Sequence, residues 1–237
     1  MKKTALFATV SVLAGVMSAQ AGGFYGAIKG GYGYLQNNLR QTTLEPLAGV
    51  IADGKEHDSV FDYKVAVGYD FGELAAEVEF SQYTQAKFNG DWTLQPEGPT
   101  CTNASCFMHN TFELNTDLMT LFANMSYAVD FGYAIKPFVT AGAGVAFVKE
   151  TGSIHVGDYE RTPVNDESFD MTAPSENHTE FAWNVGLGAE YDLSEEFSIH
   201  AMYRFVDVME IDNSKPGADV KRDMDMHEFV IGAKYMF

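Results

Sequence analysis

The sequence predicts an all-β chain, namely an eight-stranded antiparallel up-and-down transmembrane β-barrel. Three observations predict this fold. Segments in which apolar and other residues alternate recur along the chain, and a period of two is the pattern of a strand with one apolar face. The connections between these segments alternate between short and long. Nearly every apolar face is bounded by Tyr, Phe or Trp, as the aromatic girdles of membrane barrels require.

The N-terminus predicts export. Lys2 and Lys3 precede an apolar run over 4–16, and Ala19-Gln20-Ala21 fits the small-residue cleavage site of a signal peptide. We therefore expect a cleaved signal peptide over 1–21 and one barrel domain over 22–237. The apolar run is shorter than the roughly 20 residues that a spanning helix needs. A membrane-spanning mature chain must then be a barrel, because only helices and closed barrels satisfy every backbone group in lipid.

The alternation defines the predicted strands in chain order. They cover 24–34, 60–69, 74–81, 118–129, 137–148, 180–191, 196–207 and 226–237. The apolar faces of the first four are Phe24, Ile28, Tyr32 and Tyr34; Phe61, Tyr63, Val65, Val67 and Tyr69; Leu74, Ala76, Val78 and Phe80; and Met119, Leu121, Ala123, Met125 and Tyr127. Each strand is about long enough to cross a bilayer, which takes roughly 9 to 11 tilted residues.

The last four predicted strands repeat the pattern. Their apolar faces are Val139, Ala141, Ala143, Val145 and Phe147; Phe181, Trp183, Val185, Leu187, Ala189 and Tyr191; Phe197, Ile199, Ala201, Tyr203 and Phe205; and Phe229, Ile231, Ala233 and Tyr235. The chain then ends on Phe237, an aromatic residue with no polar tail after it. This ending predicts a strand that stops at a membrane interface.

The connections predict the topology. Short turns are expected at 70–73, 130–136 and 192–195, and long loops at 35–59, 85–113, 149–179 and 208–223. Outer-membrane barrels have short periplasmic turns and long extracellular loops. A soluble lipocalin-like barrel would also alternate, but with its apolar face inward. The aromatic ends of the apolar faces and the four long polar loops favour the membrane barrel.

The faces opposite to the apolar ones carry charges of both signs. By parity, the inward set is Lys29, Lys64, Arg204 and Lys234 with Asp62, Glu77, Glu79, Glu190 and Glu228, and His200 joins it. An eight-stranded barrel is just wide enough for side chains to fill its interior. Because buried charges persist only when they are paired and hydrogen-bonded, we expect a salt-bridged network that closes the lumen. Inward glycines would leave room for the long charged side chains.

Cys101 and Cys106 are the only cysteines. In an exported chain they predict a disulfide that closes a short loop. Their spacing alone would also suit a metal or a reactive thiol, but no other Cys and no close His pattern completes a zinc set. The acidic loop 149–179 would suit weak calcium binding, although it follows no calcium-loop pattern. We therefore expect no metal site and no cofactor.

Three segments resemble a known family. Phe24-Tyr25-Gly26-Ala27-Ile28-Lys29-Gly30-Gly31-Tyr32, Pro137-Phe138-Val139-Thr140-Ala141-Gly142-Ala143-Gly144-Val145 and Trp183-Asn184-Val185-Gly186-Leu187-Gly188-Ala189-Glu190-Tyr191 are similar to the small outer-membrane β-barrel superfamily. Its members include the OmpA transmembrane domain, OmpX-like proteins, opacity-type adhesins and chains called porin family proteins. The resemblance covers the mature chain, although a peptidoglycan-binding domain such as full OmpA proteins carry is expected to be absent.

The resemblance implies a compartment and partners. It places the chain in the bacterial outer membrane, among outer-membrane lipid and lipopolysaccharide. The final strand resembles the last strand of these barrels, which implies that Tyr235 and Phe237 form the C-terminal signal read by the barrel assembly machinery. We expect a monomer.

For function, we expect a structural, adhesion or surface-interaction role, with the loops meeting host or cell-surface ligands. The net charge of −18 argues against a nucleic-acid partner. The alternatives are a narrow channel for small solutes and a lipid A modifying enzyme. His200 has inward parity and His227 outward parity, and no Ser–His pair with matched parity forms a recognisable motif. We therefore expect no catalytic residue and no enzyme activity.

Overall fold

A computed structural model describes residues 22–44, 55–94, 108–159, 169–172, 175–212 and 218–237. These residues form ten strands: β1 (Gly23–Leu44), β2 (Lys55–Asp70), β3 (Leu74–Tyr83), β4 (Ala86–Leu94), β5 (Met108–Ala128), β6 (Ile135–Tyr159), β7 (Phe169–Thr172), β8 (Glu176–Asp192), β9 (Phe197–Asp212) and β10 (Ala218–Met236). Within this described part, no helix has the length and apolar character needed to cross a membrane.

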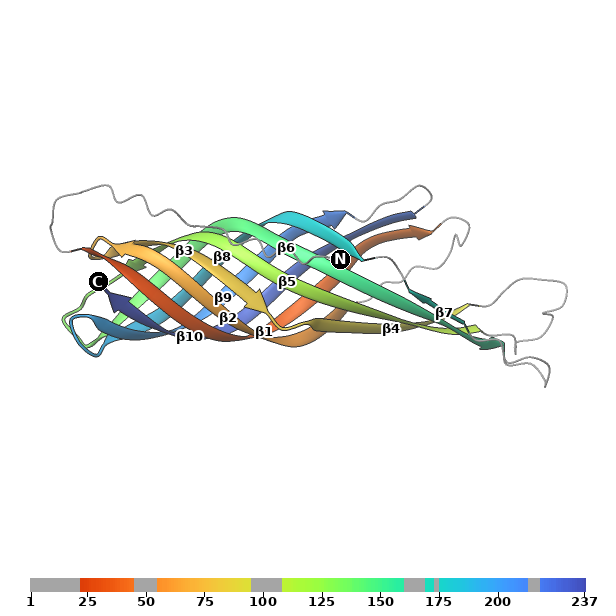
Figure 1. The fold of residues 1–237 in the computed structure, drawn as a ribbon, viewed down its shortest axis with the longest axis horizontal. Coiled ribbons are helices and arrows are strands. Elements are labelled where there is room, and N and C mark those ends of the chain that lie inside the picture. The colour runs from red at the N-terminus through yellow and green to blue at the C-terminus, as the bar shows by residue number, and fades with distance from the viewer. Residues whose placement is uncertain (1–21, 45–54, 95–107, 160–168, 173–174, 213–217) are drawn as a thin grey trace, which may run out of the picture.

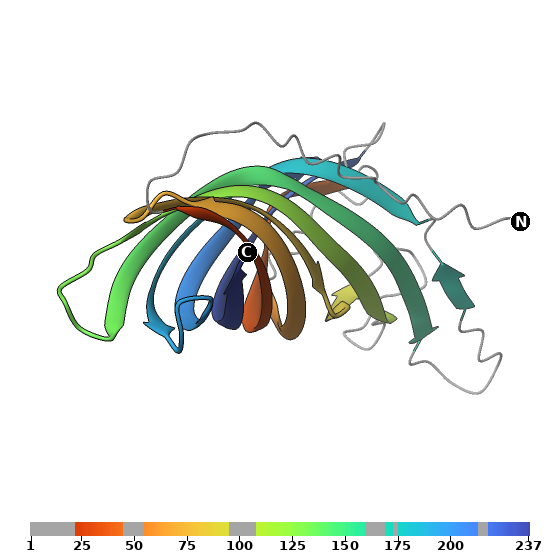
Figure 2. The same ribbon diagram turned by 60° about the vertical axis from the view of Figure 1, so that its left-hand side comes forward.

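Eight of the strands close into a barrel. Neighbours follow the order β5, β3, β2, β1, β10, β9, β8 and β6, and β6 pairs back onto β5. All of these pairs are antiparallel. Figures 1 and 2 show the strands running obliquely around the long axis, as closure of a twisted sheet requires. The predicted eight-stranded up-and-down barrel is therefore confirmed.

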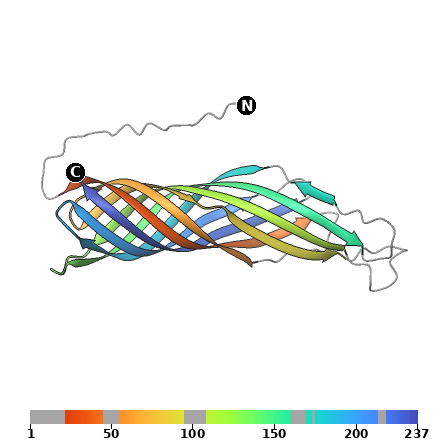
Figure 3. The same ribbon diagram turned by 60° about the horizontal axis from the view of Figure 1, so that its bottom comes forward.

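The two remaining strands extend the wall at one end. β4 continues the line of β3 along β5, after a break at Thr84 and Gln85. There the Thr84 backbone N–H donates to the Phe61 carbonyl (2.7 Å), and the Thr84 hydroxyl accepts from the Phe61 N–H (3.0 Å). β7 pairs with the far part of β6. Figures 1 and 3 show this end opposite to the C-terminus.

The four expected long loops are shorter than the sequence suggests, because strand pairing continues into them. β1 and β10 remain paired from Gln36↔Asp225 to Leu44↔Ala218, and β5 and β6 from Asp117↔Lys149 to Met108↔Tyr159. Beyond the lipid the outward face of a strand meets water, so the apolar alternation of the wall stops while the backbone hydrogen bonds continue. The hairpin tips at 45–54, 95–107, 160–168 and 213–217 lie outside the described residues, as do the predicted signal peptide 1–21 and both cysteines, Cys101 and Cys106.

The short turns lie where the sequence predicts them. In the β2–β3 turn the Gly72 N–H donates to Asp70 Oδ1 (2.7 Å), and in the β5–β6 turn the Gly132 N–H donates to Asp130 Oδ1 (2.7 Å). Both glycines have positive φ, 104° and 76°, which only glycine adopts without cost. In the β8–β9 turn the Ser194 hydroxyl accepts from the Phe197 N–H (3.0 Å).

The side-chain parity also agrees with the sequence prediction. Outward residues such as Ile28, Leu187 and Ile231 are exposed by 68%, 62% and 70%, although all three are fully apolar. Their inward neighbours, such as Lys29 and Glu228, are buried. An apolar exterior around a charged interior is the reverse of a soluble barrel, and it is the arrangement that lipid requires.

Candidate functional site in the barrel interior

The centre of the lumen holds a continuous cluster of charges. Lys29 Nζ of β1 lies 2.5 Å from Glu77 Oε1 and 2.7 Å from Glu79 Oε2, both on β3. Arg204 of β9 bridges onward, because its Nη1 lies 2.6 Å from Glu79 Oε1 and its Nε donates to Glu228 of β10. One arginine therefore joins carboxylates on two strands that are well separated around the wall.

Lys64 of β2 completes the cluster. Its Nζ lies 3.1 Å from Glu228 Oε2 and 2.8 Å from Asp62 Oδ1. The side chains of Lys64, Asp62 and Glu228 have no exposed surface. The cluster as a whole comprises Lys29, Asp62, Lys64, Glu77, Glu79, Arg204 and Glu228, and we call it the central charge cluster.

Two further lysines form ion pairs nearer to the short turns. Lys234 Nζ lies 2.6 Å from Glu190 Oε1 and 3.3 Å from Asp70 Oδ2. Lys136 Nζ lies 2.6 Å from Asp192 Oδ2, and its side chain is 32% exposed. These pairs ring the mouth of the barrel at the short-turn end. The predicted residues Lys234 and Glu190 thus form a pair separate from the central charge cluster.

His200 differs from its predicted role. It is buried on the inner wall, but it packs edge-on against the Phe138 ring with centroids 6.2 Å apart, and no ion pair joins it among the described residues. Gly232 makes room for it, since a Cβ there would lie 2.6 Å from His200 Cε1. Gly31 does the same for Asp62, because a Cβ would lie 2.9 Å from Asp62 Cγ.

Uncharged polar side chains form hydrogen bonds with the charged groups of the cluster, and the sequence analysis did not single them out. Tyr25 donates to Glu77 Oε2 (3.1 Å), and Asn124 Nδ2 donates to Glu77 Oε1 (3.2 Å). Lys64 Nζ donates to the Tyr83 hydroxyl (3.3 Å), and the Ser81 hydroxyl donates to Glu79 (3.2 Å). The signal was available, because Tyr25, Ser81 and Tyr83 share the inward parity of the charges on β1 and β3, and Asn124 lies opposite the apolar face of β5.

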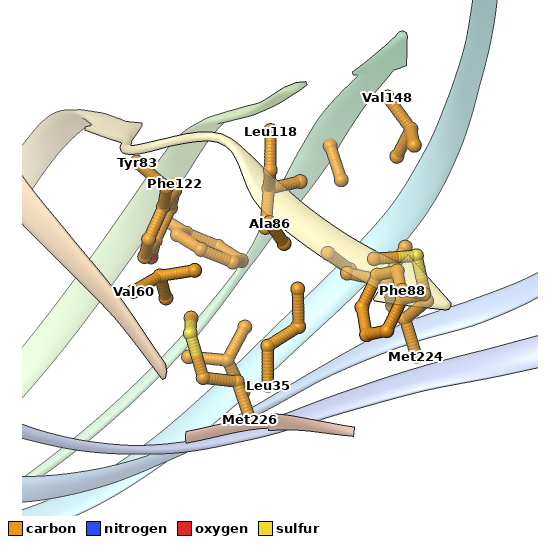
Figure 4. Close-up of a cluster of buried hydrophobic side chains, with 14 residues drawn as sticks. Leu35, Val60, Tyr83, Ala86, Phe88, Leu118, Phe122, Val148, Met224 and Met226 are labelled. Atoms are coloured by element: carbon orange, nitrogen blue, oxygen red, sulfur yellow. The ribbon is translucent and has the colours of Figure 1, made fainter. Parts of the chain in front are cut away.

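An apolar layer lies beyond the central charge cluster, toward the end that carries β4 and β7. Figure 4 shows its side chains pointing toward one another. It consists of Leu35, Val60, Tyr83, Ala86, Phe88, Leu118, Phe122, Ala146, Val148, Ala182, Val206, Val208, Met224 and Met226. The layer rests directly on the charges, since the Arg204 guanidinium lies 5.9 Å from the Phe122 ring centroid and Lys64 Nζ lies 4.6 Å from that of Tyr83.

On the other side of the cluster the lumen is hollow. A cavity of about 100 Å³ is lined by residues that include Tyr25, Glu77, Asn124 and His200. A second hollow of about 250 Å³ shares Asp70, Lys136, Glu190 and Lys234 with it and lies at the short-turn mouth. A water needs only about 10–15 Å³ of such space, so several fit in a polar chamber of this size.

Two predicted features lie on the outer surface or at the rim. His227 is half-buried, and its Nδ1 lies 2.5 Å from the Tyr203 hydroxyl, so it joins a belt of aromatic rings. Tyr235 and Phe237 make an edge-to-face contact with centroids 5.5 Å apart, and the Phe237 N–H donates to the Phe24 carbonyl (2.9 Å). Among the residues described, no three His, Cys, Asp or Glu side chains converge in a way that would hold a metal ion.

Comparisons with known proteins identify the class. Residues 4–237 match the family model described as "Outer membrane protein beta-barrel domain". The chain belongs to this family, and it is a protein of the bacterial outer membrane. The short turns are therefore periplasmic, and the apolar layer lies at the extracellular end of the lumen.

The relatives include a curated protein and solved structures. The chain is 25% identical over 193 residues to outer membrane protein PagN of Salmonella typhimurium, covering 75% of this chain and 73% of PagN. It is similar to OprG of Pseudomonas aeruginosa (TM-score 0.47, 16% identity, 91% of this chain and 96% of OprG). It is also similar to Neisserial surface protein A (TM-score 0.46, 14% identity, 92% of this chain and 100% of that protein).

The central charge cluster makes a prediction about stability. Arg204→Met leaves Glu79 and Glu228 buried without their shared cation, so we expect a loss of about 3–5 kcal/mol in unfolding free energy. Adding Glu79→Gln and Glu228→Gln removes the uncompensated charges and should recover most of this loss. The measurement is urea unfolding in detergent micelles, followed by gel mobility without boiling.

Lys136→Met is the matched control, because it removes a lysine from a partly exposed pair at the mouth. We expect it to cost about 1 kcal/mol or less. Equal effects of Arg204→Met and Lys136→Met would contradict a stabilising role for the central charge cluster.

Proposed function

We propose that this outer-membrane barrel is a surface-interaction protein with a closed lumen, and that it acts through the strand pairs that extend beyond the membrane on the extracellular side. The main observation behind the proposal is that two layers of side chains close the lumen, one after the other along the barrel axis. Seen from the periplasm, the hollow mouth ends first at the central charge cluster and then at the apolar layer. A solute would have to break both layers to pass.

Each seal has its own physical basis. The ion pairs of the central charge cluster hold side chains from five strands across the lumen, and its members Lys64, Glu79 and Glu228 are fully buried. The apolar layer excludes water, because Val60, Leu35 and Met224 are at most 1% exposed and leave hydrated ions no polar contacts. The competing candidate, a narrow channel, draws support from the hollow at the periplasmic mouth, which reaches as far as Arg204.

The extracellular extension supplies a surface for partners. Strand pairing continues beyond the apolar layer, from Asn89↔Glu113 to Leu94↔Met108 between β4 and β5 and from Ser153↔Thr172 to Val156↔Phe169 between β6 and β7. Asp58 of β2 anchors this ribbon, since its Oδ2 accepts from the Lys87 backbone N–H (2.8 Å). A ribbon that is hydrogen-bonded to the barrel wall is ordered before a partner binds, which lowers the entropic cost of binding a surface ligand.

For partners, we propose outer-membrane lipid and lipopolysaccharide around the wall, the barrel assembly machinery during insertion, and host or cell-surface ligands at the tips. The chain is proposed to act as a monomer and without nucleic acid, in keeping with its acidity. The disulfide between Cys101 and Cys106 would brace the tip between β4 and β5.

We also propose that the protein is not an enzyme. The Ser198 hydroxyl, two residues from His200, donates to Glu190 (2.9 Å) rather than to the imidazole. His227 shares its Nδ1 contact with Tyr203 and lies between the rings of Tyr203 and Phe205. Neither histidine therefore has a serine nucleophile as its partner.

Binding to a surface should depend on the hairpin tips. Replacing 160–168 by Asn-Gly leaves a connection of about five residues between the paired Val156 and Phe169, a length that hairpins use. It should lower adhesion of an expressing Gram-negative laboratory host to cultured epithelial monolayers. The matched control shortens 213–217 in the same way, and each variant must retain its heat-modifiable gel mobility. Unchanged adhesion with both tips shortened, or no adhesion by the natural chain, would refute the adhesive role.

Conductance separates the proposal from the channel. In a planar bilayer the purified barrel should give no stable current steps, because the apolar layer blocks hydrated ions. If steps occur and charge reversal by Lys64→Glu or Arg204→Glu alters them, the lumen conducts and the channel is the correct function.

The chemistry of lipid A provides the test of enzyme activity. A host that expresses the chain should keep the same lipid A mass spectrum as the host with an empty vector. A changed acyl pattern that disappears on His227→Ala or His200→Ala would establish an enzyme instead.

A further inference from the structure

The central charge cluster contains one more acidic group than basic groups. Its basic side chains are Lys29, Lys64 and Arg204, and its acidic side chains are Asp62, Glu77, Glu79 and Glu228. All of these side chains are at most 10% exposed, and with every group ionised their net charge would be −1. Because an unpaired buried charge is strongly unfavourable, the cluster needs one further positive charge or one neutral carboxyl group.

Three of the four acidic groups are held by hydrogen bonds. Glu77 and Glu79 each accept hydrogen bonds from three side chains, and Glu228 accepts them from two. In each case at least one donor is a lysine or an arginine. Hydrogen bonds from cationic donors stabilise the ionised form of a carboxyl group. These three groups are therefore ionised, and they balance the three basic side chains.

Asp62 is the exception. Its side chain has no exposed surface, and neither of its oxygens accepts a hydrogen bond among the described residues. Lys64 Nζ lies 2.8 Å from Asp62 Oδ1, but Lys64 directs its hydrogen bonds to Glu228 Oε2 and to the Tyr83 hydroxyl. A carboxylate in this place would have lost its water without gaining a hydrogen bond in return.

Charged and titratable groups face Asp62 from the strands around it. Lys64 is on the same strand, and Tyr83 lies directly opposite on β3. Glu228 of β10 meets Asp62 at Lys64, while Arg204 of β9 is bonded to Glu228. Within the described part of the chain, Lys64 is thus the cation in contact with Asp62, and Glu228 already shares it.

A bound metal cation would need space that the structure does not provide at Asp62. The two hollows of the lumen are lined by other residues and reach neither Asp62 nor Lys64 nor Glu228. On the side of β1 the Asp62 carboxyl group fills the space over Gly31, where a Cβ would lie 2.9 Å from Asp62 Cγ. A proton requires no such space, and it turns an oxygen of Asp62 into a hydrogen-bond donor.

We propose that Asp62 is a proton-binding site, and that its carboxyl group is neutral at neutral pH while the other acidic groups of the cluster are ionised. The lumen is then closed by a central charge cluster without net charge. Loss of the proton at alkaline pH would leave one uncompensated negative charge in the layer and weaken it. This inference rests on the closed lumen of the proposed function and adds a dependence of that closure on pH.

Folding of the barrel then takes up a proton. In the unfolded chain an aspartate is ionised above about pH 4, whereas the folded barrel keeps the proton on Asp62. Because the folded state binds one proton more, the unfolding equilibrium constant should rise about tenfold for each pH unit above about pH 5, until Asp62 ionises. Other groups add their own dependence on pH, so the difference between the natural chain and Asp62→Asn isolates this contribution.

Infrared spectroscopy tests the proposal directly. A protonated carboxyl group has a C=O stretching band that is separate from the bands of carboxylates and of the backbone. We expect this band at pH 7 in the purified barrel, in micelles of a detergent without carbonyl groups. The band should shift when aspartate is labelled with ¹³C at its carboxyl carbon, and it should be missing from Asp62→Asn. The labelled natural chain gives an answer even if Asp62→Asn does not fold.

Asp192→Asn is the matched control, because it makes the same substitution at an aspartate that pairs with Lys136 at the mouth. It should keep both the infrared band and the dependence of urea unfolding on pH that Asp62→Asn loses. Each variant is first checked for heat-modifiable gel mobility.

Two results would overturn the proton site. The first is the absence of a protonated-carboxyl band at pH 7, and unfolding that responds to replacement of sodium by choline would then indicate a bound cation instead. The second is a band that Asp62→Asn leaves in place. Current steps in a planar bilayer, with the Asp62 band present, would contradict the closed lumen and still support the proton site.

Discussion

The structure depends on one constraint, which is that hydrocarbon offers no hydrogen bonds to a backbone. An open sheet would leave a row of N–H and C=O groups unpaired in lipid along each of its two edges, at several kcal/mol for each group. The pairing of β5 with β6 removes both rows, because these strands would otherwise be the two edges of the wall. Outside the lipid the constraint ends, and there β4 and β7 form sheet edges that face water, which can satisfy them.

Closure at eight strands then determines what the interior can contain. The space is narrow enough that side chains from opposite strands meet, so inward charges must find partners across the lumen rather than water. Arg204 meets this demand by reaching Glu79 and Glu228 at once, which a lysine with a single nitrogen would do less well. Glycines make this crowded interior possible. Gly31 and Gly232 leave the space that the side chains of Asp62 and His200 occupy.

The sequence predicts the membrane-embedded part of the barrel well, because lipid on one face and a polar lumen on the other impose a strict period of two. The same parity brings Lys29, Glu79 and Arg204 to the inner wall. It does not reveal which strands lie opposite each other, so the separation of Lys234 and Glu190 from the central charge cluster could not be predicted. Parity also fails above the membrane, where Leu35, Met224 and Met226 point inward but are apolar. Above the membrane the inward face of a strand is apolar and the outward face is polar, which is the reverse of the pattern within the membrane. The alternation therefore did not predict that β1 and β10 continue there.

This reversal of phase divides the molecule into two halves with different interiors. Within the membrane the outside is apolar and the inside is polar. Above it the inside is mainly apolar, although Asn37, Thr116 and Glu150 are buried there too, and the outside is more polar, as in a water-soluble protein. The apolar layer lies where the two patterns meet, and it gives the extracellular ribbon a core of its own that does not depend on lipid. Such a core keeps strands paired well outside the bilayer, where Asp58 and Lys87 fasten β4 to β2. Residues at the tips can then change without disturbing either the lipid-facing wall or the central charge cluster.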